Sequence, residues 1–202
     1  VFIYGLCREI SECPSLMSLR LSVQADHVNA VQDVVDTYLK RILTNTKRVG
    51  AYTDPDWQAF LTEARLKQHI DGDVIIAEKA NLVNFSNLNI TSRLTGVIQQ
   101  VFPNKRIEPS GCFHYPTTGY MGWHTNSDVS CRRLYITWAA EANKSFFRYY
   151  QDNKVITDYD DKGLTFRLFD ITNKPPYLWH CVGSQTDRIS IGYRVFDTYD
   201  DR

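Results

Sequence analysis

The sequence lacks the features that mark membrane-spanning and nucleic-acid-binding proteins. No uncharged apolar run approaches the roughly 18 to 20 residues that a membrane-spanning helix needs. The apolar start at residues 1–6 has neither a basic region before it nor a small-residue cleavage site after it, so we do not interpret it as a signal peptide. Basic and acidic residues balance at 23 each, which leaves no net positive charge to hold a nucleic-acid backbone. We therefore expect no membrane partner, and the composition disfavours nucleic acid as a partner.

Cysteine is also sparse and unpatterned. The five cysteines are odd in number and contain no CxxC pair. This pattern argues against a disulfide framework and against a zinc ribbon. A reducing, cytoplasmic location is the simplest interpretation of these free thiols.

The first half of the chain shows helical periodicity. With 202 residues there is enough volume for one domain with a sizeable core, and we predict a single domain over 1–202, in which residues 1–107 are mainly helical support. Apolar residues recur at helical spacing from Asp26 to Leu43, with Asp26 as the candidate N-cap. Asp54-Pro55 predicts the start of a second helix that runs to about His69, and a third is predicted over Thr91–Phe102.

Residues 108–196 change to short runs of aromatic and β-branched residues separated by turn formers. The expected strands lie at 112–115, 134–138, 145–150, 164–169 and 189–196. We interpret the acidic run Asp158–Asp161 as a solvated loop, and for Arg132-Arg133 we favour a solvated turn over a clamp for a substrate anion. Helices followed by strands predict an α+β protein in which N-terminal helices pack outside a β-sandwich or barrel.

Two of the five histidines stand where a metal site would need them. His124 lies in the segment GWHTN and His180 in LWHC. Residues i and i+2 of a strand face the same side, so His124 and Asn126 can approach one ion together from a single strand end. A second histidine from a distant strand completes one face of an octahedron and leaves three positions for a bidentate cosubstrate and O2.

These residues resemble a known family. His124-x-Asn126, His180 and Arg188-Ile189-Ser190 are similar to the HxD…H…RxS signature of the Fe(II)/2-oxoglutarate-dependent dioxygenases. The segment from Tyr115 to His124 resembles the approach to the first metal histidine in AlkB-like and prolyl-hydroxylase-like members, and Arg188 to Arg194 resembles the two-arginine strand of AlkB-like members. The resemblance covers residues 108–196. It implies a double-stranded β-helix, or jelly-roll core, that uses Fe(II), 2-oxoglutarate and O2, with ascorbate as a candidate reductant.

The resemblance also implies roles for individual residues. His124, Asn126 and His180 would be the catalytic metal ligands, and the implied cosubstrate contacts are Arg188, Ser190, Tyr115 and Arg194. Arg188 suits the far carboxylate of 2-oxoglutarate, because a guanidinium binds a carboxylate through two hydrogen bonds and stays charged when buried. The implied reaction hydroxylates a protein side chain or a small molecule and releases succinate and CO2. We expect the loops around residues 51–56 and 71–88 to meet that substrate.

Asn126 departs from the family pattern, which has a carboxylate at this position. An amide supplies only a neutral carbonyl oxygen, so metal affinity should drop. Three explanations stay open: Asn126 ligates through its carbonyl oxygen, Asp128 reaches the metal instead, or the chain is a catalytically degenerate jelly-roll binding module. The halogenase branch also lacks the carboxylate, but its replacement residue is smaller than asparagine. The oxygenase is the leading hypothesis and the binding module is the alternative.

Overall fold

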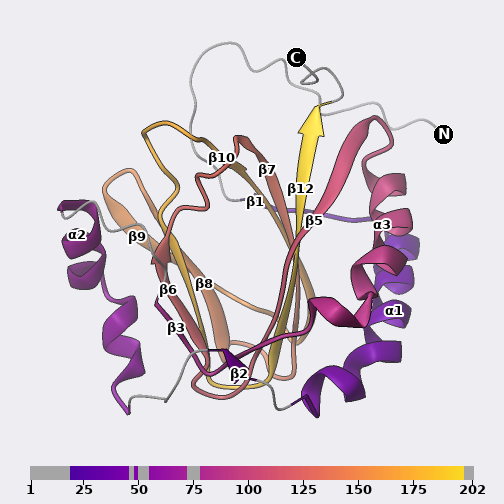
Figure 1. Ribbon diagram of the computed structural model, residues 1–202, viewed down its shortest axis with the longest axis horizontal. Helices are drawn as coiled ribbons and strands as arrows, with labels where there is room; N and C mark the ends of the chain where they lie inside the picture. Colours follow the sequence, from indigo (N-terminus) through magenta and orange to yellow (C-terminus); the bar gives the residue numbers. More distant parts are fainter. Residues whose placement is uncertain (1–18, 46–47, 50–54, 72–77, 198–202) are drawn as a thin grey trace.

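The computed structural model describes residues 19–45, 48–49, 55–71 and 78–197 as two antiparallel β-sheets with helices on their outer faces (Figure 1). The helices are α1 (Ala25–Leu43), α2 (Glu63–Asp71) and α3 (Ile90–Val101), with short 3-10 helices η1 (Trp57–Leu61) and η2 (Ser86–Leu88). Four short strands lie before residue 85, namely β1 (Leu19–Arg20), β2 (Arg48–Val49), β3 (Lys79–Ala80) and β4 (Leu82–Asn84). The remaining strands are β5 (Lys105–Tyr115), β6 (Tyr120–His124), β7 (Cys131–Ala139), β8 (Ser145–Gln151), β9 (Lys154–Tyr159), β10 (Gly163–Ile171), β11 (His180–Ser184) and β12 (Arg188–Asp197).

The connections between strands define the fold. The larger sheet has the order β1-β10-β7-β12-β5-β4-β2, and the smaller has the order β3-β6-β11-β8-β9. From β5 to β12 the chain changes sheet at every connection except the one between β8 and β9. Eight strands therefore form two facing halves, β10-β7-β12-β5 and β6-β11-β8-β9. This arrangement is a double-stranded β-helix, or jelly roll, and it confirms the predicted α+β fold with helices packed outside.

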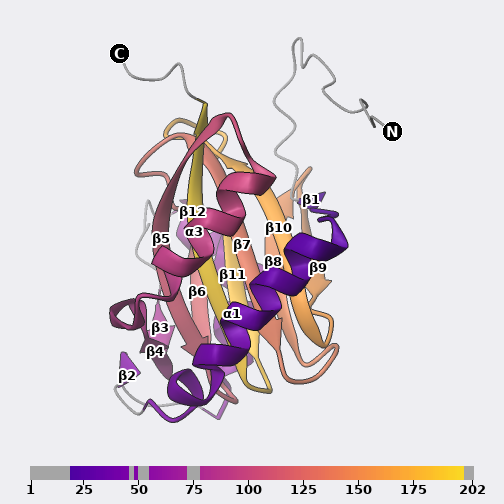
Figure 2. The ribbon, with the colours of Figure 1, turned by 90° about the vertical axis from the view of Figure 1, so that its right-hand side faces the viewer.

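Helices α1 and α3 cover the outer face of the larger sheet, as Figure 2 shows. The apolar cluster between these helices and the sheet includes Val31 and Val35 of α1, Leu94 and Ile98 of α3, and Ile189, Ile191 and Tyr193 of β12. Along β12, Ile189, Ile191, Tyr193 and Val195 face these helices, whereas Arg188, Ser190 and Arg194 line the space between the sheets. This is the two-residue alternation of a strand whose two faces meet different surroundings.

The smaller sheet is covered on its outer face by η1 and α2 (Figure 1). The residues of this second apolar cluster include Trp57, Leu61, Leu66, Trp123, Trp179 and Cys181. Trp123 and Trp179 directly precede the two histidines in sequence, and the Trp123 indole also donates a hydrogen bond to the Thr62 carbonyl at 2.9 Å. Packing on the outer face therefore fixes the strand ends that carry His124 and His180.

The helix predictions are confirmed in part. Helix α1 begins one residue earlier than predicted, but its N-cap is Gln24, so the assignment of Asp26 as the cap is wrong. The predicted helix to His69 is instead interrupted at Thr62, whose ψ of 161° is extended, and its proposed cap Asp54 lies outside the described residues. None of the helices within the described ranges is long and apolar enough to cross a membrane.

Candidate active site

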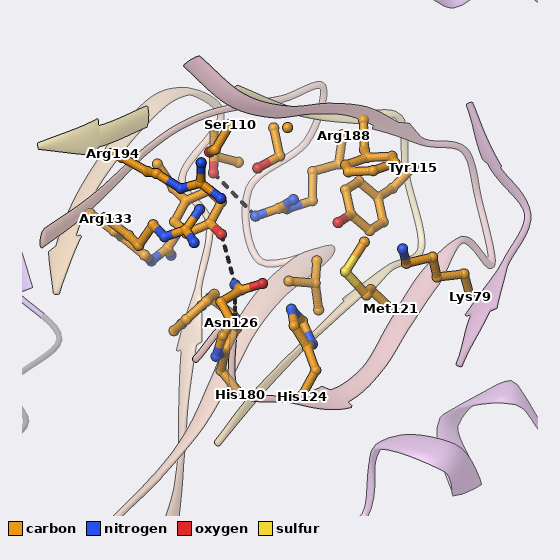
Figure 3. Close-up of a pocket in the computed structure, with 18 of the residues that line it drawn as sticks. Lys79, Ser110, Tyr115, Met121, His124, Asn126, Arg133, His180, Arg188 and Arg194 are labelled. Atoms are coloured by element: carbon orange, nitrogen blue, oxygen red, sulfur yellow. Dashed lines mark hydrogen bonds between the residues drawn. The ribbon is translucent and has the colours of Figure 1, made fainter. Parts of the chain in front are cut away.

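A cavity of about 580 Å³ lies between the two sheets. Its apolar lining comes from both sheets and includes Phe113, Tyr115, Met121, Phe147 and Val182. The polar lining includes both candidate metal histidines and the arginines at 133, 188 and 194 (Figure 3), together with Arg167. The cavity thus gathers residues that are up to 115 positions apart, from Lys79 to Arg194, as a binding site formed between two facing sheets must.

His124 and His180 meet across the smaller sheet. Strands β6 and β11 are antiparallel neighbours, and their register places His124 directly opposite His180. The two imidazole rings lie 4.1 Å apart between centroids, and both side chains are buried at the floor of the cavity (Figure 3). The structure therefore brings together the two histidines that the sequence singled out.

Both imidazoles have a defined tautomer. Nδ1 of His124 lies 2.8 Å from the Gly122 carbonyl oxygen, and Nδ1 of His180 lies 3.0 Å from the Leu178 carbonyl oxygen. A carbonyl oxygen only accepts hydrogen bonds, so Nδ1 carries the proton in each ring and Nε2 keeps a lone pair. Such bonds to the backbone also orient metal-binding histidines.

Burial keeps both rings neutral. Burial, aided by the nearby positive charges of Lys79 and Arg133, lowers the pKa of His124 to about 4. Burial, followed by the neighbouring His124, also holds the pKa of His180 well below its ordinary value. At neutral pH each ring can therefore offer an Nε2 lone pair to one ion without first losing a proton.

Asn126 lies beside this histidine pair. It follows β6 in the left-handed conformation, with a φ of 53°, which asparagine tolerates better than most residues. Its amide nitrogen donates to the Tyr135 hydroxyl at 3.1 Å and lies 3.0 Å from Nε2 of His180 (Figure 3). A metal on His180 would take the lone pair that accepts this hydrogen bond, so the amide would have to rotate before its oxygen could ligate.

Asp128 pairs with arginines. Its two carboxylate oxygens bind Nη2 of Arg133, at 2.8 Å, and Nη2 of Arg194. In the ranges that the structure describes, no three His, Cys, Asp or Glu side chains are gathered as a metal-binding group. Of the two oxygen donors weighed from the sequence, the structure thus brings Asn126 to the histidines and commits Asp128 to Arg133 and Arg194.

Arg188 is buried in the wall of the same cavity. Its Nε donates to Asp160 at 2.8 Å and its Nη2 donates to the Thr137 hydroxyl at 3.1 Å. The guanidinium carbon lies 5.0 Å from the centre of the Tyr115 ring. Nη1 is buried with no hydrogen-bond partner among the described residues. A buried donor left unpaired is costly, so this atom is one that a bound acceptor would satisfy.

Asp160 corrects the interpretation of residues 158–161 as a solvated loop. Its side chain is fully buried and is held by Arg188, Arg167 and the Ser145 hydroxyl. Burial alone would raise the pKa of this carboxyl, but the two arginines outweigh burial and lower it to about 2. Asp158 and Asp160 are two residues apart at the end of a strand and so share a face, which was the one available sign that they act together.

The interpretation of Arg133 as part of a solvated turn is wrong. The residue lies on β7, is only 4% exposed and borders the cavity. Arg194 also borders the cavity, on the face predicted for it. The irregular pairing between β12 and β5 places the extra residue in β5, because Ile191 pairs with Cys112 and Tyr193 with Pro109. The alternation of faces along β12 is therefore kept. The other two residues predicted to contact the cosubstrate, Ser190 and Tyr115, line the same cavity.

The segments expected to meet the substrate are described only in part. Residues 51–54 and 72–77 lie outside the described residues. Of the rest of these two segments, Lys79 borders the cavity, on the side opposite Arg133 and Arg194 (Figure 3). The identity of the substrate must therefore be argued from the cavity wall itself.

No known protein family and no curated protein matches this sequence. Solved structures similar to this chain include a Pseudomonas putida prolyl-4-hydroxylase, at 12% identity and a TM-score of 0.45, covering 91% of this chain and 92% of the other. A Trichoplax adhaerens prolyl hydroxylase bound to a hypoxia inducible factor peptide has 13% identity and a TM-score of 0.41, covering 87% and 94%. EctD from S. alaskensis, with 2-oxoglutarate and 5-hydroxyectoine, has 12% identity and a TM-score of 0.40, covering 93% and 73%. Likeness at this level leaves function to be argued from the site.

Proposed function

We propose that this protein is an Fe(II)- and 2-oxoglutarate-dependent oxygenase that hydroxylates a protein side chain or a small molecule, with release of succinate and CO2. The observation that carries the proposal is the pairing of His124 and His180, both neutral and both with Nε2 unprotonated, in one cavity with Arg188. Arg188 has a buried donor that lacks a protein partner in the described part of the chain.

The residues of the cavity fit both Fe(II) and 2-oxoglutarate, but the metal ligands carry no negative charge. His124 and His180 would hold the metal through Nε2, and the Asn126 carbonyl oxygen would be the third protein ligand after the amide rotates. This set is neutral, so it attracts Fe(II) less than a set with a carboxylate. Arg188 would hold the far carboxylate of 2-oxoglutarate, because the unpaired Nη1 is a donor of the required charge.

When bound, the iron and 2-oxoglutarate would activate O2, which is the oxidant, and the protein supplies geometry and a dry cavity. Asp160 and Thr137 orient Arg188 from behind, so the guanidinium does not need to reorganise when a carboxylate arrives. The Gly122 and Leu178 carbonyls hold the Nδ1 protons of the two histidines. Ser190, Tyr115 and Arg194 remain predicted contacts of 2-oxoglutarate. Arg194 would make this contact while it keeps its ion pair with Asp128.

The alternative function is a non-catalytic binding module for a small dicarboxylate, and Asn126 is the feature that favours it. Here Arg188 would still bind the dicarboxylate, but the two histidines would act only as neutral parts of the cavity floor. The two functions differ in whether 2-oxoglutarate is consumed.

Purified protein incubated with Fe(II), ascorbate and 2-oxoglutarate should form succinate, even slowly without substrate. Asn126→Asp restores the anionic ligand and should bind Fe(II) at least ten times more tightly than the wild type. Ser127→Asp is the matched control, because it adds the same charge next to Asn126 in the chain. Dicarboxylate binding without succinate formation in either the wild type or Asn126→Asp would establish the binding module and exclude the oxygenase.

A further inference from the structure

Two arginines lie together beside Asn126 and share one carboxylate (Figure 3). Arg133 comes from β7 and Arg194 from β12, and their register places them directly opposite each other. Asp128, 52% exposed, is the one carboxylate with which either guanidinium forms an ion pair among the described residues. Two positive charges thus face one negative charge at the wall of the cavity.

Burial makes this imbalance significant. Arg133 is 4% exposed, and its Nε has no hydrogen-bond partner within the described ranges. The Nε of Arg194 is buried and unpaired in the same sense. Asn126 adds no charge, and Asp160, the one buried carboxylate among the described residues, is already held by Arg167 and Arg188. A buried guanidinium with so little compensation is stabilised by an incoming anion.

We propose that Arg133 binds a carboxylate of the substrate while Arg194 beside it keeps its pair with Asp128, so that the substrate is an organic anion with an apolar body. The proposal rests on the proposed oxygenase function and names the class of molecule that the same cavity takes besides 2-oxoglutarate. Binding replaces the contact of the half-exposed Asp128 with Arg133. The carboxylate then lies next to Asn126, and the rest of the molecule extends along the apolar wall.

The other side chains of the cavity wall favour a ligand with an apolar body. Phe113, Met121, Phe147 and Val182 line the same cavity and offer contacts that a small inorganic anion could not use. A suitable probe is therefore 3-phenylpropanoate, which joins a carboxylate to a short apolar body. Its amide, 3-phenylpropanamide, has nearly the same shape without the charge, and the comparison isolates the charge.

Calorimetric titration tests the proposal on the 202-residue protein kept anaerobic with Fe(II) and saturating 2-oxoglutarate. The wild type should bind 3-phenylpropanoate at least ten times more tightly than 3-phenylpropanamide. Arg133→Met should weaken binding of the carboxylate at least tenfold and change the Kd of 2-oxoglutarate by less than threefold. Arg132→Met is the matched control, because Arg132 is adjacent on β7 but pairs with Asp197 outside the cavity, and it should change neither Kd more than twofold.

The variant Asp128→Asn tests for a gain in probe affinity, which misfolding could not produce. It removes the carboxylate that competes for Arg133, so the carboxylate probe should bind at least three times more tightly than to the wild type. Unchanged or weaker binding in Asp128→Asn overturns the proposal, and so does equal binding of probe and amide. A large loss of 2-oxoglutarate binding in Arg133→Met also overturns it, because Arg133 would then serve the cosubstrate. If 2-oxoglutarate does not bind the wild type, the proposed function fails, and the same probe titration without it still decides this proposal.

Discussion

Arg188 and Asp160 form a buried ion pair, 2.8 Å between Nε and Oδ2, with exposed side-chain fractions of 2% and 0%. Asp160 also binds Arg167, whose side chain is fully buried. Breaking a buried pair by removing one partner leaves an uncompensated charge, which typically costs about 3–5 kcal/mol. The pair therefore links the stability of the fold to the orientation of the proposed cosubstrate-binding arginine.

Asp160→Asn should lower the free energy of unfolding by about 3–5 kcal/mol, because Arg167 and Arg188 would then share no buried negative charge. Urea denaturation at neutral pH measures the change. Asp161→Asn is the control, since Asp161 is 63% exposed and pairs with the exposed Arg20, and its loss should cost less than about 1 kcal/mol. Equal effects of the two variants would contradict the buried role of Asp160.

Acid should reduce the difference between the wild type and Asp160→Asn. The pKa of Asp160 is lowered from 3.8 to about 2, so its ionised form stabilises the folded state above pH 3.8 and this contribution is lost as the pH falls through about 2. Because of this pKa shift, the difference in the free energy of unfolding between the wild type and Asp160→Asn should narrow by about 2 kcal/mol between pH 5 and pH 2. Urea midpoints of both proteins across this range measure it, and a constant gap would show that Asp160 has an ordinary pKa.

Arg188→Lys should weaken 2-oxoglutarate binding at least tenfold while keeping the positive charge. A lysine ammonium cannot donate to Asp160 and Thr137 and at the same time present a planar pair of donors to a carboxylate. Calorimetry with 2-oxoglutarate measures the loss. Arg106→Lys is the control, because Arg106 is a surface residue on β5 that pairs with Glu108. Wild-type affinity in Arg188→Lys would remove Arg188 from the proposed site.

Local patterns predicted the fold class, and the resemblance predicted that His124 and His180 act together. The alternation in β12 placed Arg188, Ser190 and Arg194 on one face, and the i, i+2 rule placed Asn126 in the same cavity as His124. These relationships depend on residues within one strand. They could therefore be read before any partner strand was known.

Relationships between distant strands could not be predicted in the same way. The position of Asp160 depends on Arg167 from β10 and Arg188 from β12, and a run of four residues with three acidic side chains gives no sign of burial. Arg133 was likewise assigned to a turn because its burial depends on β12, its neighbour in the sheet. The break at Thr62 reflects packing of Trp57 and Leu61 on the smaller sheet, which helical periodicity does not encode.

Two glycine-to-alanine changes should have opposite effects on stability. A Cβ at Gly183, on β11, would come within 2.7 Å of Leu61, Phe146 and Trp57, so Gly183→Ala should destabilise the protein by about 1–3 kcal/mol. Gly96 lies within α3 with nothing within 4 Å of an added Cβ, so Gly96→Ala should stabilise the protein by about 0.5–1 kcal/mol. Urea denaturation measures both changes. Because Gly183 follows His180 on the same short strand, the strain should also weaken metal binding in Gly183→Ala, whereas Gly96→Ala should leave it unchanged. A neutral Gly183→Ala would mean that η1 does not pack closely against β11.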